Sequence, residues 1–236
     1  MKRLIPLLLL LCLPAALRAQ WQIGVNAGYT YDLYTVNTGY QYDLNYQPQG
    51  GLTVAVPMTR RFNDRIGLRL DPSYVQKNTL VSRSELVGGA WTHSLNAYLS
   101  LPVMAEFSFG GQYVRGYADA GVYAGTWLSS QVSGEQPVLA MGAVAETSQS
   151  FDEAYAFSKK RDNRLDAGLA AGLGVNFHTR GRMGFNLEGR VYYALTSTKN
   201  DYMRVKYPAY HTTFVLQAGI FWLLDKSEKM RSCNCE

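Results

Sequence analysis

The most constraining feature of this chain is an alternation of apolar and polar residues that recurs in eight separate segments. Each segment has one apolar face, because a strand places successive side chains on opposite sides of its sheet. Several segments exceed the ~5 to 6 residues usual for soluble strands and suit the ~9 to 11 of a tilted membrane strand. The segments span residues 21–31, 52–58, 66–74, 95–109, 114–124, 165–177, 185–195 and 214–224.

The linkers between these segments alternate in length. The short connections lie near 61–64, 110–112 and 179–182, and the long ones span 32–48, 77–92, 129–163 and 197–210. Bacterial membrane barrels have short periplasmic turns and long extracellular loops. We therefore expect an all-β, antiparallel, up-and-down transmembrane β-barrel of about eight strands over residues 20–224. It would lie in the outer membrane of a Gram-negative bacterium, with both termini periplasmic.

The first 19 residues have the parts of a secretory signal peptide. Lys2 and Arg3 precede a leucine-rich run that is too short to cross a membrane as a helix, and Ala19 provides a small residue at the cleavage point. We expect the mature chain to begin near Gln20 and to end in a polar periplasmic tail over residues 225–236.

The charge of the chain does not favour a nucleic-acid partner. Loss of the three basic residues of the signal peptide lowers the basic total from 23 to 20, against 18 acidic residues, so the mature net charge is +2. The short basic groups at 159–161 and 180–182 are typical of solvated turns and loops. Only Cys233 and Cys235 remain after processing, and their place in the tail predicts no disulfide framework.

Aromatic residues gather near both ends of the alternating segments, as they do at the two interfaces of a membrane barrel. Trp127 breaks the parity of its segment, which predicts either a bulge or a register slip. The expected interfacial aromatics are Trp21, Phe107, Phe109, Phe177 and Trp222 on the turn side, and Tyr29, Tyr31, Tyr74 and Tyr193 on the loop side.

Charged residues of both signs recur near the middle of the polar faces. A soluble lipocalin-type barrel would place them on its solvated outside. The same faces carry Gly168, Gly172 and Gly174, which suit a crowded interior and favour the membrane barrel. Buried charges must be paired, so we expect one network inside the barrel. Its predicted members are Arg69, Asp71, Glu106, Arg115, Asp119, Glu188 and Arg190.

The three histidines do not predict a catalytic site. His93 and Ser94 are adjacent and would point to opposite faces of a strand. His211 and Thr213 would share a face, but threonine is an unusual nucleophile and no carboxylate lies at a matching position. His178 lies at a turn. No metal-spaced cluster or phosphate-binding loop is present. We expect no catalytic, cofactor-binding or metal-binding residues and no enzymatic activity.

Five short glycine-rich or aromatic motifs carry a resemblance to a known family. They are Gly24 through Gly28-Tyr29, Leu101-Pro102-Val103-Met104, Tyr117-x-Asp119-x-Gly121, Asp166-x-Gly168 through Gly174, and Glu188-x-Arg190. With them the mature chain resembles the PorT-like outer-membrane β-barrel domains of Gram-negative bacteria that have a type nine secretion system. The resemblance implies a barrel and, in one branch of the family, a role in maturation or export of surface proteins.

Three functions remain open at this point. The expected one is a non-enzymatic binding or assembly component that supports secretion or maturation of surface proteins. Its expected partners are outer-membrane lipid and proteins of a secretion system, with no nucleic acid. The alternatives are a lipid-modifying outer-membrane enzyme and a small pore, although side chains alone can fill an eight-stranded interior.

Overall fold

The computed structural model describes residues 20–36, 44–83, 89–140, 143–200 and 208–224, with only the backbone path given between 138 and 147. The expected signal peptide and the expected tail with its two cysteines lie outside the described residues. No helix in the described part of the chain is long and apolar enough to span a membrane.

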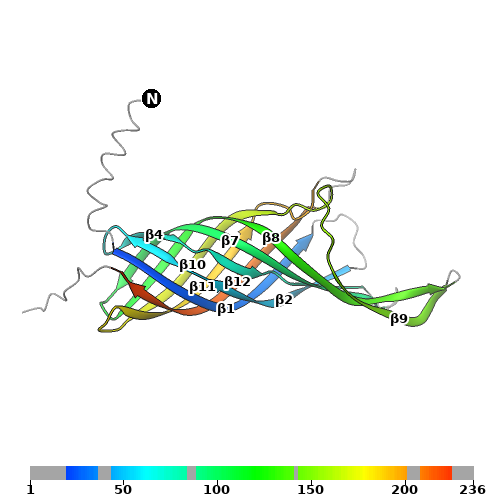
Figure 1. The fold of residues 1–236 in the computed structure, drawn as a ribbon, viewed down its shortest axis with the longest axis horizontal. Helices are drawn as coiled ribbons and strands as arrows, with labels where there is room; N and C mark the ends of the chain where they lie inside the picture. Colours follow the sequence, from blue (N-terminus) through cyan, green and yellow to red (C-terminus); the bar gives the residue numbers. More distant parts are fainter. Residues whose placement is uncertain (1–19, 37–43, 84–88, 141–142, 201–207, 225–236) are drawn as a thin grey trace, which may run out of the picture.

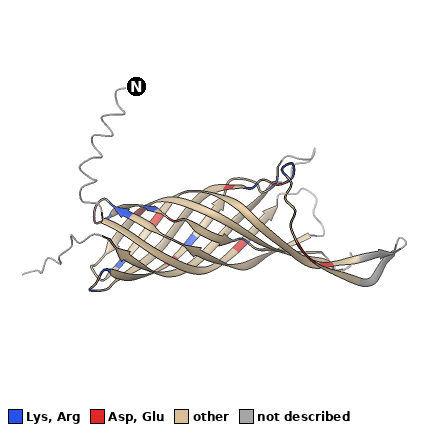
Figure 2. Ribbon diagram, viewed as in Figure 1, with Lys and Arg blue, Asp and Glu red and all other residues tan. Residues whose placement is uncertain are grey.

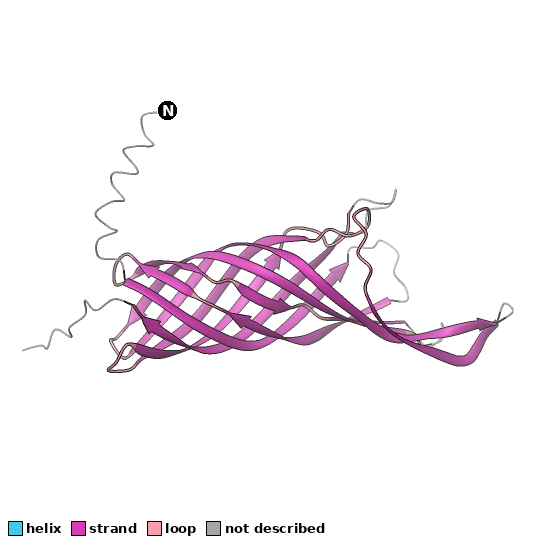
Figure 3. Ribbon diagram, in the orientation of Figure 1, coloured by secondary structure: helices cyan, strands magenta, loops and turns pink. Residues whose placement is uncertain are grey.

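Over the described residues, twelve antiparallel strands form a single sheet, coloured magenta in Figure 3. In chain order they are β1 (Gln20–Val36), β2 (Leu44–Ala55), β3 (Met58–Arg61), β4 (Ile66–Leu70), β5 (Ser73–Gln76), β6 (Thr79–Arg83), β7 (Trp91–Gly110), β8 (Val114–Ala140), β9 (Ala143–Ala154), β10 (Leu165–His178), β11 (Met183–Ala194) and β12 (Ala209–Leu223).

The pairings run round a ring and return to β1. Strands β2 and β3 both pair with β1, and β4, β5 and β6 all pair with β7, so each group is one interrupted wall strand. The ladder continues through β8, β10, β11 and β12 back to β1. The two interrupted groups also pair with each other, so the ring is closed. When each interrupted group is counted as one strand, the barrel wall has eight strands, which confirms the predicted fold class. Figure 1 shows the barrel from the side. The ninth strand, β9, pairs with β8 beyond the point where β10 leaves it.

Proline and asparagine explain the interruptions of the second and third wall strands. Pro57 separates β2 from β3 and Pro72 separates β4 from β5, because proline has no N–H to donate to a ladder. At the gap between β5 and β6, the side chain of Asn78 accepts a hydrogen bond from the Asn96 N–H at 3.1 Å. Side-chain bonds here replace the backbone bonds of a regular strand.

The outside of the barrel is apolar and the inside is polar. Leu52, Leu173 and Leu216 are more than 60% exposed, whereas Thr30 and Asp71 are fully buried. In Figure 2 most of the barrel ribbon is tan, with few charged positions. This arrangement inverts the usual order of a soluble protein and suits a wall surrounded by lipid. It therefore contradicts the lipocalin-type alternative, in which the apolar face would turn inward.

The predicted interfacial aromatics lie on the outer wall. Eight of the nine are exposed, and Trp222 is half-buried. Trp127 has interior parity because it shares a face with the buried Tyr123, and the register shifts by one residue directly after it, where Tyr98 pairs with Trp127 but Ala97 pairs with Ser129. The bulge lies after Trp127 and does not change its face, so Trp127 simply points into the barrel, where it stacks on Tyr98.

The long loops are shorter than the sequence predicts. Strand β6 occupies part of 77–92, and β8 and β9 form a hairpin across most of 129–163. The first long loop also shrinks, because β1 extends to Val36 and β2 begins at Leu44. These extensions carry no sustained alternation of an apolar face with a polar face, so an alternation test does not detect them. The three short turns are where they were predicted, and Gly110 has a φ of 110°, which favours glycine.

The hairpin of β8 and β9 projects from the end of the barrel opposite the first described residue (Figure 1). We expect a protease of broad specificity, added to intact cells, to cut first within residues 129–163, because the loop end should face outward. The exposed Arg180 in the turn between β10 and β11 serves as the internal control. Peptide mapping that finds cleavage first at Arg180 would invert this topology.

Candidate functional site: the barrel interior and its rim

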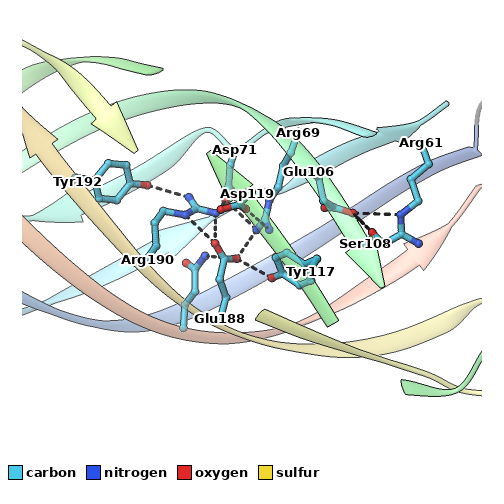
Figure 4. A network of polar contacts seen from close by, with 11 residues as sticks. Arg61, Arg69, Asp71, Glu106, Ser108, Tyr117, Asp119, Glu188, Arg190 and Tyr192 are labelled. Carbon is cyan, nitrogen blue, oxygen red and sulfur yellow. Dashed lines mark hydrogen bonds and ion pairs between the residues drawn. The ribbon is translucent and has the colours of Figure 1, made fainter. Parts of the chain in front are cut away.

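A cluster of two arginines and three carboxylates fills the middle of the barrel (Figure 4). Arg69 lies on β4 and Asp71 directly after it, while Glu188 and Arg190 lie on β11 and Asp119 on β8. Residues two apart in a strand share a face, so each of the first two pairs points inward together. We call these five residues the central network.

The central network is joined by short ion pairs, some within one wall strand and some across the lumen. The Arg69 guanidinium lies 2.6 Å from Glu188, 3.1 Å from Asp71 and 3.2 Å from Asp119. Arg190 donates to Asp71 at 2.6 Å and to Glu188 at 2.7 Å. Every member is at most 4% exposed. Charged groups this deeply buried persist only when they are paired and hydrogen-bonded.

Neutral side chains complete the central network. Tyr117 donates its hydroxyl hydrogen to Glu188 at 3.0 Å, and Gln217 donates to the same carboxylate at 3.1 Å. A Cβ on Gly172 would lie 2.5 Å from an Asp119 oxygen, so glycine makes room for the cluster there. The glycines on this face therefore serve the crowded interior that the sequence predicts.

Two predicted members of the network lie apart from it. Glu106 pairs with Arg61 at 3.2 Å and accepts a hydrogen bond from Ser108, nearer the turn end. Arg115 makes no ion pair with the described residues and is only half-buried. The basic partner of Glu106 is Arg61, not the predicted Arg115. Arg61 was missed because it was placed in the turn at 61–64.

A second buried ion pair lies nearer the loop end. Lys77 is fully buried and lies 2.6 Å from Asp166, which also accepts a hydrogen bond from Tyr123 at 3.0 Å. The Lys77 ammonium lies 5.1 Å from the ring centre of Tyr98 and 5.2 Å from that of Tyr123. The sequence had placed Lys77 in a loop, so this pair was missed.

The buried His211 lies next to this pair, with Tyr98 in contact with both Lys77 and His211. His211 Nδ1 lies 2.6 Å from Asp32, and Thr213 donates to the other oxygen of Asp32 at 2.6 Å. The prediction that no carboxylate matches His211 and Thr213 is wrong, because β1 extends through Asp32, which pairs with Thr213 in the ladder. His211 lies on β12, and its side chain is buried.

These contacts limit the chemistry of the interior. His211 and Thr213 both bind Asp32 instead of each other, so the nucleophile-to-base contact of a hydrolytic triad is missing. Among the described residues no group of three or more His, Cys, Asp or Glu is placed to hold a metal ion. The groups that form the interior are built to pair with one another, which suits a structural plug.

Aromatic side chains continue upward from His211 to the rim. Tyr98 lies against the His211 ring and stacks on Trp127, with ring centres 5.7 Å apart in both pairs. Trp127 in turn stacks on Tyr155 at 5.7 Å and meets Phe157 edge-on at 4.9 Å. The interior side chains are therefore in continuous contact from the central part of the barrel to its loop end.

The chain matches a known protein family. Residues 15–200 of this chain match the family described as "Outer membrane protein beta-barrel domain", which is well over half of its 236 residues. Comparison with curated protein sequences gives no match.

Several solved outer-membrane proteins resemble the fold at low sequence identity. OprG from Pseudomonas aeruginosa is 16% identical, with 87% of this chain and 96% of that chain covered and a TM-score of 0.49. Neisserial surface protein A is 13% identical, with 86% and 97% covered and a TM-score of 0.45. Ail of Yersinia pestis is 15% identical, with 85% and 98% covered and a TM-score of 0.39.

Removal of Arg190 should strongly destabilise the barrel. Arg190→Ala would leave Asp71 and Glu188 to share Arg69, and breaking a buried pair in this way costs about 3 to 5 kcal/mol. The free energy of unfolding can be measured in urea from the fraction of barrel that migrates faster without boiling. The matched control is Arg180→Ala in the exposed turn, with an expected change below about 0.5 kcal/mol. Equal stability of the two variants would show that the central network does not hold the barrel together.

Proposed function

This chain belongs to the outer membrane β-barrel domain family, and on that premise we propose that it is a non-enzymatic, non-conducting binding component of the outer membrane. It supports secretion or maturation of surface proteins, as its PorT-like motifs imply, and both of its termini face the periplasm. The observation that carries the proposal is the hairpin formed by residues 131–154, which we call the projecting hairpin.

The projecting hairpin leaves one strand edge unpaired. Within the described residues β9 pairs with β8 only and lies at the end of the strand order. The twelve residues of β9 extend over roughly 40 Å at ~3.3 Å each. A free edge of this length presents backbone N–H and C=O groups to an added strand. The hairpin therefore offers a docking site for an extended segment of another protein.

The charge of the hairpin indicates which segments fit. Glu135, Asp152 and Glu153 are exposed, and the sequence 131–154 contains no lysine or arginine. Acidic side chains beside a free edge favour a partner strand that carries basic residues and disfavour a second acidic copy of the same hairpin. The proposed partner is thus an extended, basic segment of a protein on its way to the cell surface.

The barrel interior supports a role other than transport. Two ion-pair layers, the central network and the pair formed by Lys77 and Asp166, cross a lumen that eight strands leave only wide enough for side chains. The shared contact of His211 and Thr213 with Asp32 gives no activated nucleophile, so the interior does not favour a lipid-modifying enzyme.

Blocking the free edge should abolish partner docking without unfolding the hairpin. Tyr155 directs its N–H to Ser130 on β8, so by alternation the N–H of Ser150 points to the free edge. Ser150→Pro removes that donor, and Ser150→Thr is the matched control that keeps it. In cells that lack the wild-type protein, we expect surface-protein display to fall severalfold with Ser150→Pro and to stay unchanged with Ser150→Thr.

A shortened hairpin provides the second arm of this test. Replacing residues 133–152 by Asn-Gly joins Val132 to Glu153 through a two-residue turn. These two residues are direct ladder partners, and by the same alternation their backbone groups bond each other, as such a turn requires. The variant should retain the faster unboiled migration of a folded barrel and lose surface-protein display. Normal display by this variant would rule out the hairpin as the docking site.

The closed interior predicts low conductance. In planar bilayers the purified protein should show no steady current, because paired side chains occupy the lumen. A current that persists in the wild type and changes on Arg190→Ala would identify the central network as a pore lining and would overturn the proposal of a non-conducting barrel.

A further inference from the structure

The turn between β9 and β10 carries four exposed cations. Lys159, Lys160, Arg161 and Arg164 fall within six residues, and the single acidic residue among them is Asp162, which is buried. We call the four cations the basic platform. It lies at the loop end of the barrel, where a blue segment marks the turn in Figure 2.

The backbone of this turn is held rigidly by Asp162. That carboxylate accepts hydrogen bonds from the Ser158 N–H at 2.8 Å, the Arg161 guanidinium at 2.9 Å and the Tyr155 hydroxyl at 2.9 Å. Burial alone would raise the pKa of Asp162, but these bonds outweigh it and lower the pKa. The carboxylate is therefore ionised at neutral pH and continues to hold the turn.

A second loop supports the turn from the side. Asn200 donates to the carbonyl oxygens of Lys159 at 3.0 Å and Asp162 at 3.1 Å, and Thr198 accepts the Asn163 N–H at 3.0 Å. The positions of Lys159 and Lys160 are thus fixed by their backbone.

The two arginines of the platform are already engaged and the two lysines are not. Arg161 lies over the Tyr155 ring at 4.8 Å, and Arg164 lies over the Phe157 ring at 4.6 Å and donates to the Trp127 carbonyl oxygen. Within the described residues the ammonium groups of Lys159 and Lys160 make no ion pair or hydrogen bond. They are free to bind an anion from solvent or from a membrane surface.

The apolar wall begins directly below the platform. Leu165 follows Arg164 in sequence and is 56% exposed. Leu169 on β10, Tyr193 on β11 and Leu195 directly after β11 are exposed to a similar degree. Cations placed at the edge of a lipid-facing wall lie at the depth of the lipid head groups. The basic platform would bind the anionic head group of a lipid, and the apolar wall would contact its hydrocarbon tails.

We infer that the basic platform binds the phosphate groups of a phosphorylated glycolipid, lipopolysaccharide, in the outer leaflet. Lys159 and Lys160 contact the phosphates, and the acyl chains lie along the wall at Leu165 and Leu169. The inference rests on the proposed orientation, in which the loop end faces outward, but it is independent of the docking function of the projecting hairpin.

The test compares two double variants of equal charge. Lys159→Gln/Lys160→Gln removes two platform cations, and Arg180→Gln/Arg182→Gln removes two exposed cations from the opposite end. Purified, detergent-solubilised protein is titrated with lipopolysaccharide, and the dissociation constant is measured. At about fivefold for each lysine, the platform variant should bind roughly 25-fold more weakly. The control variant should change by less than about twofold.

Further arms distinguish the sources of phosphate. Lipopolysaccharide stripped of its phosphates should bind the wild type as weakly as intact lipopolysaccharide binds the platform variant. Inorganic phosphate at millimolar concentration should not displace the glycolipid, and displacement would identify a site for small anions and overturn the lipid assignment. Equal losses in the two double variants, or no loss in either, would also overturn it. Because the titration uses solubilised protein, its result does not depend on orientation or on surface-protein display.

Discussion

The pairing of buried charges with opposite charges inside a narrow lumen is the constraint on which this structure depends. Lipid surrounds the wall, so backbone polar groups must bond within the sheet and polar side chains must turn inward. Inside, Arg69 and Arg190 hold Asp71, Asp119 and Glu188, which come from three different parts of the wall. The pairs Arg69–Glu188 and Arg190–Asp71 join opposite sides of the barrel, so these wall strands are tied across the lumen as well as along the ladder.

The sequence predicted the wall because one rule, alternation at a period of two, holds wherever lipid lies on one side. The same rule placed Arg69 with Asp71 and Glu188 with Arg190 on inward faces. Partners across the lumen depend on register between strands, which alternation does not contain. For this reason Glu106 was assigned to a common network with Arg115, although Arg61 is its partner. Lys77 and Asp32 were missed because their strands continue beyond the apolar pattern.

The projecting hairpin extends beyond the barrel wall and is not subject to the alternation that lipid imposes. The projecting hairpin has no alternation of an apolar and a polar face. Its sequence is mostly polar over 131–136 and 146–154 and mostly apolar over 137–145, so its strands leave no signal with a period of two. Its stability comes from pairing and from local contacts such as Phe151, which lies over its ladder partner Gly134. Acidic residues along this edge also limit indiscriminate self-association. A surface built in this way can change in sequence without disturbing the membrane wall.

The interrupted second and third wall strands have a consequence for the order in which the barrel assembles. From β7 onward the wall is made of long, unbroken strands joined mainly by hairpins, whose pairings are local and cost little loop-closure entropy. The short pieces between β2 and β6 gain fewer ladder bonds each, and β1 must meet β12 from the far end of the chain. Pairing of the C-terminal strands therefore costs less entropy, and these strands can serve as the template for the others. The ladder between β1 and β12 has the largest loop-closure entropy cost, because nearly the whole chain separates the two strands.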